Sequence, residues 1–357
     1  MMNRPPVTST SRLARRADGM QTADRMVPDE TPVALSFAGT THAVMMASPS
    51  DLHDFALGFS LTEGIIGTFE EIEEIAVEDV GAGVDIQIRL KDQANTRFQA
   101  RRRRLAGPVG CGLCGIESID EAMRAVDEVR SAPLTLSPEE VAEAVRLLSE
   151  QQPYHRQTGA VHAAGFYVPG RGIVAAREDV GRHNALDKLA GALSKAGISG
   201  SSGAVVVTSR VSVEMVQKTA AIGAPFILAV SAPTALAIRT ADASGMTLVA
   251  LVRGDDFDVF THSNRIQTEP SAMSHDAASN PHTKLIRMAN QIGTFFESKV
   301  DRAEGVAGIA EHINKFWEPR MRRQLYEVLD AGGEGLKPIV LEAAPSIKRP
   351  APVEKVA

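Results

Sequence analysis

The spacing of hydrophobic residues predicts regular structure from about Pro32 onward. In the first third of the chain it indicates two strands, a helix and a further strand, at residues 33–37, 42–46, 52–63 and 84–90. Gly39 supplies the expected turn between the first two strands. Ser50 is the expected N-cap of the helix, and Gly64 is its expected end. These elements predict a small α+β module with an antiparallel sheet.

Unbroken apolar runs replace the alternating pattern in the middle of the chain, as expected of parallel strands that are covered on both faces. The runs and the amphipathic segments between them occupy residues 204–207, 213–222, 226–230, 234–243 and 246–252. The order is βαβαβ. Right-handed crossovers would place both helices on one face of the sheet, with ligands beyond the carboxyl ends of the strands. A last strand at residues 257–261 ends the module.

A helix with a strong start signal precedes this sheet. Ser137 is followed by Pro138 and Glu140, which together give an N-cap, a proline at the first helical position and a capping-box glutamate. The expected buried stripe of this helix consists of Val141, Val145 and Leu148. The sequence therefore predicts a helix that begins at Pro138 and packs against the sheet by one face.

Composition suggests how the chain divides. The polar ends, residues 1–28 and 348–357, are expected to be disordered. Residues 266–281 lose apolar periodicity and gain Ser, Asn and Pro, so we interpret them as a linker. Three amphipathic helices are expected in the segment that contains Trp317. The resulting modules are an N-terminal α/β module at residues 29–130, an α/β domain at 131–265 and a small helical module at 282–347.

Charge and composition exclude several classes of protein. The 357 residues carry a net charge of −6, which argues against broad nucleic-acid binding because such binding needs a basic surface. No stretch approaches the roughly 18 consecutive apolar residues of a membrane helix, and the N-terminus lacks the apolar segment of a signal peptide. Two cysteines do not make a disulfide framework. We therefore expect a cytoplasmic protein in a reducing compartment, without nucleic-acid or membrane partners.

The candidate chemistry is concentrated in one loop. Cys111 and Cys114 are the only cysteines, and they lie among three glycines in residues 110–115, before an expected helix at 116–126. From the residues alone the loop could be a simple turn, a zinc site completed by histidines, a redox dithiol or a persulfide carrier. No histidines show zinc-finger spacing, and no strand precedes the motif as in a thioredoxin-like site. The glycines favour a loop that moves or fits closely around a ligand.

Three further stretches are candidates for binding or catalysis. The run Arg101-Arg102-Arg103-Arg104 would lower the pKa of a nearby thiol and attract an anionic acceptor, or it is a solvated basic stretch. Residues 178–189 gather ionisable groups at an expected helix start, with His183 and Asp187 one turn apart. A structural role and a role in proton transfer both remain open for these two. The stretch Arg253-Gly254-Asp255-Asp256 is either a tight turn or part of a ligand site.

Taken together, several segments resemble the FdhD family of formate dehydrogenase accessory sulfurtransferases. These segments are residues 44–49, 55–64, 110–115, 178–189, 209–210, 214–218 and 248–262. The resemblance implies a carrier that takes sulfur from a cysteine desulfurase. It further implies that the carrier supplies the terminal sulfido ligand of the bis-molybdopterin guanine dinucleotide (bis-MGD) molybdenum cofactor, before insertion into formate dehydrogenase.

The resemblance also implies particular site residues and a particular fold. It places the persulfide on Cys111 and makes Cys114 its partner. The family's cofactor-binding stretch falls on Leu251, Val252, Arg253, Gly254, Asp255 and Asp256. We expect no metal-ligating residues. The implied fold is α/β, with a small N-terminal α/β roll joined to a cytidine-deaminase-like α/β domain, in a homodimer.

The C-terminal module has a resemblance of its own. Residues 284–292, 315–323 and 332–336 are similar to the delta subunit of NAD-dependent formate dehydrogenases. The chain therefore resembles a fusion, and we hypothesise that residues 282–347 dock on the formate dehydrogenase catalytic subunit. The alternative from another class is a non-catalytic assembly chaperone that only holds the cofactor or the apoenzyme.

Overall fold

The computed structural model describes residues 4–17, 19–105, 126, 128–129, 133–267, 283–297 and 301–350. The chain divides into two compact units, Met1–Glu269 and Pro270–Ala357. Both α/β modules expected from the sequence belong to the first unit. Within the described ranges, no helix is long and apolar enough to cross a membrane.

The N-terminal module is a four-stranded sheet, and two helices contribute side chains to the core on one of its faces. Its elements are β3 (Thr31–Phe37), β4 (Thr40–Ala47), α1 (Leu52–Thr62), η1 (Phe69–Glu71), β5 (Ile72–Asp79), β6 (Val84–Leu90) and α2 (Asp92–Leu105). The strand order is β4-β3-β6-β5. The predicted hairpin, helix and last strand are confirmed. The expectation of a wholly antiparallel sheet is wrong, because β3 and β6 run parallel and α1 and β5 form part of the connection between them.

Two details of this module differ from the prediction. The N-cap of α1 is Asp51 in the left-handed region (φ 53°), one residue after the expected Ser50. Ser50 N–H instead donates to Ser48 O at 2.8 Å, in a tight turn that delays the helix. The sequence analysis also missed α2, whose Phe98 packs against Phe37 with ring centroids 4.9 Å apart. The four-arginine run is the last part of α2.

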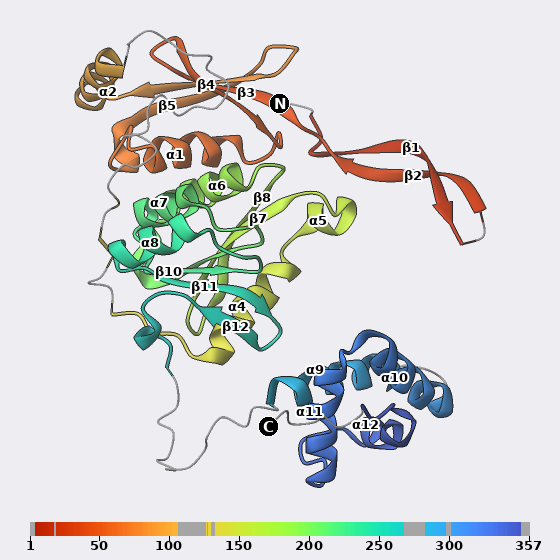
Figure 1. Cartoon of the computed structure of the whole chain (residues 1–357). Helices are drawn as coiled ribbons and strands as arrows, with labels where there is room; N and C mark the ends of the chain where they lie inside the picture. The colour runs from red at the N-terminus through yellow and green to blue at the C-terminus, as the bar shows by residue number, and fades with distance from the viewer. Residues whose placement is uncertain are drawn as a thin grey trace. The chain divides into compact units, whose positions relative to one another are not determined.

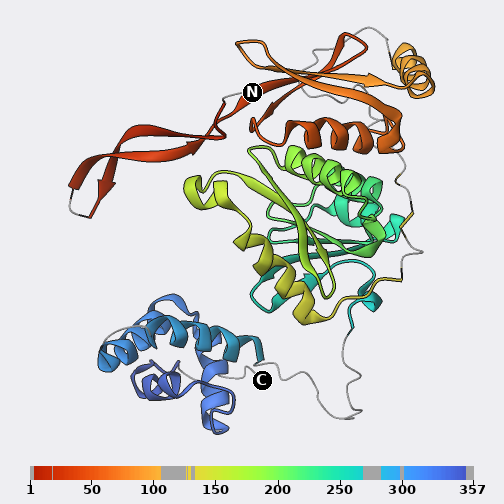
Figure 2. The same cartoon turned by 180° about the vertical axis from the view of Figure 1, so that it is seen from behind.

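The expected disordered N-terminal tail is wrong for residues 7–28. These residues form an antiparallel hairpin, β1 (Val7–Arg16) and β2 (Gly19–Pro28), with an unbroken register. We call this hairpin the arm, because it projects from the body of the first unit (Figures 1 and 2). Most of its side chains are polar and exposed, so the apolar alternation that marks a half-buried strand is absent from its sequence.

The central sheet has six strands in the order β12-β11-β10-β9-β7-β8. The strands are β7 (His162–Val168), β8 (Gly172–Asp179), β9 (Ala204–Val207), β10 (Phe226–Ala229), β11 (Thr247–Arg253) and β12 (Asp256–Val259). The predicted parallel strands and the last strand are confirmed. The hairpin of β7 and β8 was not predicted. Gly165 and the alanines of β7 give a run without alternation, and every residue of β7 after His162 is buried.

Helices cover both faces of this sheet. They are α4 (Pro138–Glu150), α5 (Pro153–Thr158), α6 (Arg182–Lys195), α7 (Val213–Ile222) and α8 (Ala235–Ser244), with short turns η2 (Gly200–Ser202) and η3 (Ser263–Arg265). The side chains of α6, α7 and α8 share one core with one face of the strands, and α4 packs on the other face. Both predicted crossover helices therefore lie on one side, as expected. The capping box of Ser137 and Glu140 at the start of α4 is present.

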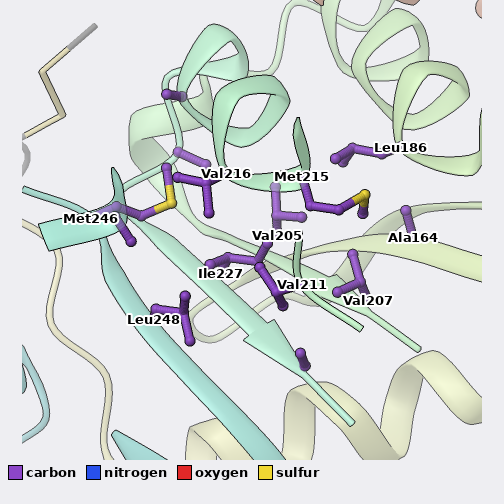
Figure 3. Packing of buried hydrophobic residues seen from close by; sticks show 14 of the residues in the cluster. Ala164, Leu186, Val205, Val207, Val211, Met215, Val216, Ile227, Met246 and Leu248 are labelled. Atoms are coloured by element: carbon purple, nitrogen blue, oxygen red, sulfur yellow. The ribbon is translucent and has the colours of Figure 1, made fainter. Parts of the chain in front are cut away.

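The core under α7 is built mainly from aliphatic side chains, together with Phe166 and two methionines. Figure 3 shows side chains of the strands and of α6 and α7 in contact within this layer, among them Val205, Val207, Leu186, Met215 and Val216. All of these are at most 2% exposed. The close packing fixes the starts of the helices relative to the ends of the strands.

The two sheets of the first unit are joined through α1 and α6, which lie side by side between them (Figures 1 and 2). Two glycines allow this contact. A Cβ on Gly58 would lie 1.7 Å from Asp187 O, and a Cβ on Gly191 would lie 1.9 Å from Asp54 O. No side chain larger than hydrogen fits at either position. The two helix backbones therefore touch directly.

The second unit is a helical module with its own core. Its elements are α9 (Thr283–Glu297), α10 (Arg302–Phe316), α11 (Pro319–Asp330), α12 (Pro338–Ala343) and η4 (Ala344–Ser346). The three predicted helices are confirmed, and α12 was not predicted. Trp317 is buried in the core with Ile313 and Leu325. Most of the expected linker and most of the expected C-terminal tail lie outside the described residues.

Candidate functional site

The carboxyl ends of β9, β10 and β11 lie at one edge of the central sheet, because these strands run parallel. We call this region the carboxyl edge. The loops beyond the strands continue the ladder of backbone bonds. Val211 N–H donates to Ala232 O at 3.2 Å, Thr234 N–H donates to Val211 O at 3.0 Å, and Leu251 N–H donates to Ser231 O at 3.3 Å. These backbone hydrogen bonds therefore hold the loops of the carboxyl edge together as one continuous surface.

Three helices begin at the carboxyl edge. Their N-caps are Gly181 for α6, Ser212 for α7 and Thr234 for α8. Of these N-caps, Thr234 alone uses its side chain, which accepts a bond from Ala237 N–H at 3.2 Å. The first backbone N–H groups of α6 and α7 have no such cap, and helix N-termini carry a partial positive charge. This arrangement favours an anionic ligand such as a phosphate group.

The stretch predicted to bind the cofactor is the turn between β11 and β12, at the carboxyl edge. Leu251 has a left-handed φ of 58° at an irregularity in β11. Backbone strain of this kind is uncommon in leucine and costs about 1–3 kcal/mol. Val252 is 1% exposed, and its side chain packs in the core on the side of α4. Residues 253–256 are exposed, and Gly254 is the turn residue with φ 59°.

The start of α6 brings a cation and a histidine–glutamate contact to the same edge. Arg182 Nε is buried, and within the described ranges it has no hydrogen-bond partner. His183 Nε2 lies 2.9 Å from Glu214 Oε2 in the first turn of α7. The hydrogen bond from His183 lowers the pKa of Glu214, although burial opposes this effect. The pair joins the beginnings of α6 and α7, so His183 contacts Glu214, whereas Asp187, one turn further along α6, belongs to a different cluster.

His162 is a neutral neighbour of this cluster at pH 7. It is half-buried at the start of β7, opposite Asp179 of β8. Burial lowers the pKa of His162, and the nearby charge of Arg182 lowers it further. A base whose protonated form is disfavoured can take up a proton when an anion binds beside it.

A buried ion pair fixes the turn that leads into α6. Asp179 Oδ2 lies 2.6 Å from Lys188 Nζ, and both side chains are fully buried. Asp179 also accepts hydrogen bonds from Gly181 N–H at 2.8 Å and from Asn184 Nδ2 at 3.0 Å. Oδ2, the oxygen that contacts Lys188, also accepts from Ser48 N–H at 3.0 Å, which ties the N-terminal module to the same turn. The geometry of the α6 N-terminus is thus set by charges inside the protein.

Asp187 belongs to a second buried cluster, away from His183. Lys218 Nζ donates to Asp187 at 2.8 Å and to Glu63 at 2.7 Å, and Thr62 Oγ1 donates to Asp187 at 2.6 Å. Burial alone would lower the pKa of Lys218, but the charges of Asp187 and Glu63 outweigh burial, so its pKa is raised. The lysine is therefore charged. The cluster joins α1, α6 and α7, and we assign it a structural role.

The relation to known proteins follows from this geometry and from the sequence. Residues 28–267 match the FdhD/NarQ family. The chain belongs to this family. Residues 284–344 match a second family, the NADH-dependent formate dehydrogenase delta subunit FdsD. The chain therefore combines an FdhD/NarQ unit with an FdsD-like helical module, as the resemblances in the sequence implied.

Individual relatives agree with this assignment. The sulfur carrier protein FdhD of Agrobacterium fabrum is 58% identical over 256 residues, which cover 72% of this chain and 94% of that protein. The sulfur carrier protein FdhD of Cupriavidus necator is 47% identical over 269 residues, covering 75% of this chain and 93% of that protein. A crystal structure of a protein from Desulfotalea psychrophila, assigned as a formate dehydrogenase accessory protein, superposes with a TM-score of 0.59 at 29% identity. The superposition covers 74% of this chain and 100% of the Desulfotalea psychrophila chain.

The predicted catalytic residues of this FdhD/NarQ chain, Cys111 and Cys114, lie outside the described residues. The backbone of Arg101-Arg102-Arg103-Arg104 is helical, and the side chains of these arginines are also outside the described set. Among the residues that the structure describes, no three His, Cys, Asp or Glu side chains are grouped as ligands for a metal ion. The roles of both cysteines remain predictions.

Sequence reasoning missed several residues at the carboxyl edge of the FdhD/NarQ unit. It singled out the stretch 178–189 without a role for Arg182 itself, weighed His162 only as a histidine that could complete a zinc site, and gave no role to Glu214. These residues come from three separate segments that only the sheet topology brings together. One signal was present in the sequence. Arg182 and Glu214 both lie next to expected helix starts, where charged side chains face the same sheet edge.

Proposed function

We propose that this chain is a sulfur carrier that moves persulfide sulfur from a cysteine desulfurase to the bis-MGD cofactor of formate dehydrogenase. Cys111 would carry the sulfur and Cys114 would help to release it. The support is membership of the FdhD/NarQ family, sulfur carrier relatives at up to 58% identity, and a CxxC motif that holds the only two cysteines of the chain.

The chemistry would proceed in two sulfur-transfer steps. In the first, the Cys111 thiolate attacks the terminal sulfur of the desulfurase persulfide, and the desulfurase cysteine leaves as a thiolate. In the second, the Cys114 thiolate attacks Cys111 Sγ. A Cys111–Cys114 disulfide forms and the terminal sulfur leaves as hydrosulfide, which carries the electron pair to the acceptor. A thiol reductant must then reduce the disulfide before the next cycle.

The carboxyl edge is the surface that best suits the acceptor. The cofactor carries two guanine dinucleotides with anionic diphosphates. The uncapped N-termini of α6 and α7, Arg182 and the exposed Arg210 offer donors and positive charge at one place. Backbone groups at Leu251 and Gly254 complete the edge. In this proposal the residues of the edge bind and orient the acceptor, and the sulfur chemistry belongs to the cysteines. This convergence of helix N-termini and Arg182 is the observation that carries the binding proposal.

The first experiment tests sulfur loading. The full chain is incubated with a cysteine desulfurase and cysteine, and intact mass is measured under non-reducing conditions. We expect an adduct of one sulfur on wild type and on Cys114→Ala, and no adduct on Cys111→Ala. An unmodified wild-type protein, or an adduct that persists in Cys111→Ala, would contradict the proposal.

The second experiment separates the carrier from a chaperone that only holds the cofactor or the apoenzyme. Formate dehydrogenase is produced in cells that contain wild type or Cys111→Ala, and its activity and molybdenum content are measured. A carrier predicts lost activity with molybdenum retained. A non-catalytic chaperone predicts that both remain at the wild-type level.

The helical module supports formate dehydrogenase as the destination of the sulfur. A match to a delta subunit of that enzyme in the same chain suggests that residues 282–347 dock on the apoenzyme, while the first unit supplies the sulfurated cofactor. A pull-down with the isolated catalytic subunit tests this, with the first unit alone as the control. Equal retention of both would remove the docking role.

A further inference from the structure

The corner between α10 and α11 of the helical module exposes a large aromatic side chain. Phe316, the last residue of α10, is 63% exposed, whereas Trp317 directly after it is 6% exposed and lies in the core of the module. Among the described residues of the module, the other large apolar side chain classed as exposed is Leu341, at 39%. An exposed phenylalanine leaves apolar area available for burial against a partner. Phe316 is therefore a candidate contact residue.

Phe316 stands at the end of a row of rings. The centroid of the His312 ring lies 4.8 Å from that of Phe316, and the centroid of the Phe296 ring lies 6.4 Å from that of His312. Lys315 Nζ lies 5.5 Å from the centroid of the Phe316 ring. Phe296 packs against the core of the module, so the row extends from the core to the surface. The Phe316 ring is thus supported by its own module and still presents most of its area to solvent.

The backbone that carries Phe316 is held at several points. Asn314 Nδ2 donates to Ser346 O at 2.9 Å, and Lys348 N–H donates to Asn314 Oδ1 at 2.6 Å. These bonds tie the end of α10 to the residues that follow α12, while Trp317 anchors the start of the turn in the core. A side chain on a fixed backbone loses little further freedom on binding. The corner is therefore preorganised for contact with another molecule.

The same corner is basic in an acidic chain. Residues 315–323 contain one acidic residue, Glu318, whereas the whole chain carries a net charge of −6. The basic residues of this stretch are Lys315, Arg320, Arg322 and Arg323. Arg322 donates to Lys348 O at 3.1 Å and thus serves the module itself, but Lys315 and Arg320 are exposed. An exposed aromatic ring beside exposed cations fits a partner surface that has an apolar pocket and acidic residues around it.

We propose, on the basis of the docking role proposed above for the helical module, that Phe316, Lys315 and Arg320 form its contact with the formate dehydrogenase catalytic subunit. Phe316 enters an apolar pocket of that subunit, and the two cations face acidic residues at the rim of the pocket. The enzyme subunit is the occupant because the match to the delta subunit FdsD covers residues 284–344, which include this corner. A second copy docked through the same corner in a twofold contact would bring two basic surfaces together.

The test of the aromatic contact compares two exposed apolar residues of the module. Binding of the full chain to the immobilised catalytic subunit is measured by its association and dissociation rates. Phe316→Ser should raise Kd about tenfold or more, mainly through faster dissociation. Leu341→Ser is the matched control, and its Kd should equal that of wild type. Leu341 lies beside Gly333, just after the end of α11, whereas Phe316 lies just before its start, and the 12 residues of α11 span about 18 Å.

The test of the charges compares two pairs of cations. Lys315→Gln with Arg320→Gln should slow association several-fold, and the remaining binding should weaken less with added salt than that of wild type. The control, Arg302→Gln with Lys337→Gln, removes the same charge from residues that are paired with Glu342 and Glu297. It should keep the wild-type association rate. The charge variants leave the apolar residues in place, so they decide the question if Phe316→Ser fails to fold.

The outcomes separate this contact from the docking role itself. If wild type binds more tightly than the first unit alone, and Phe316→Ser and the charge variant bind as wild type does, the module docks through another surface and the proposed contact is wrong. If wild type binds no better than the first unit alone, the docking role fails and the contact fails with it. A change in the molar mass of the chain in Phe316→Ser, with binding to the catalytic subunit unchanged, would assign the corner to a second copy and overturn the proposal.

Discussion

Lys218 shows how much a single charged side chain inside this protein depends on its neighbours. It is 6% exposed and is held between Asp187 and Glu63. Taking such a pair out of water carries a large desolvation cost, which the attraction between the charges must offset. The pair is therefore tolerated only as a whole. Removing one member leaves a buried charge without a counterion.

We predict that Lys218→Met lowers the free energy of unfolding by about 3–5 kcal/mol, because Asp187 is then buried and unpaired. The double variant Lys218→Met with Asp187→Leu should recover a large part of this loss. Urea unfolding followed by circular dichroism measures both. If the double variant were less stable than Lys218→Met, the cluster would contribute more than the removal of unpaired charge.

His162 gives a prediction for pH dependence. Its pKa is lowered in the folded protein, so between the usual histidine value of about 6.5 and the lowered value the unfolded chain binds more protons than the folded one. Stability should therefore fall as the pH drops through this window. Above it the histidine is neutral in both states and contributes no slope. In His162→Gln, the urea midpoint should fall less between pH 7.0 and 5.5 than in wild type, and an equal fall would contradict the lowered pKa.

At the scale of elements, the contact of α1 with α6 connects the two sheets of the first unit. Gly58 and Gly191 let the two backbones meet. We predict that Gly191→Ala destabilises the protein by about 3 kcal/mol, since the new methyl group would overlap Asp54 O and the helices would have to separate. Gly67→Ala is the matched control, because its nearest neighbour is the end of a flexible side chain at 4.0 Å. The control should change the unfolding midpoint little.

The sequence predicted those elements whose signal is local. The βαβαβ order was readable because its strands are continuous apolar runs and its helices end at Gly223 and Gly245, which adopt the expected left-handed conformation. The parallel pairing of β3 with β6 could not be predicted, because it depends on the path of the long connection between these two strands. The arm was missed because two mutually paired polar strands need no apolar alternation. The partners of Lys218 and His183 lie on other elements, so their roles became visible only with the topology.

At the scale of the whole molecule, the chain holds two units with separate cores, one of the FdhD/NarQ family and one similar to a formate dehydrogenase subunit. Covalent linkage raises the effective concentration of one unit near the partner of the other. The gain is independent of any new contact between the units. A sulfur carrier fused to a docking module would thus deliver its product where the module binds.

Removing the helical module should reduce delivery of sulfur and leave sulfur loading unchanged. A chain that ends at residue 269 should accept sulfur on Cys111 to the same extent as the full chain, because the loading chemistry belongs to the first unit. It should support formate dehydrogenase activity in cells several-fold less well at equal abundance, since delivery then depends on diffusion. Supplying residues 270–357 as a separate protein should not restore activity, because the linkage is what supplies the advantage. Full activity of the truncated chain would show that the fusion contributes nothing to delivery. A loss of sulfur loading would show that the two units do not act independently.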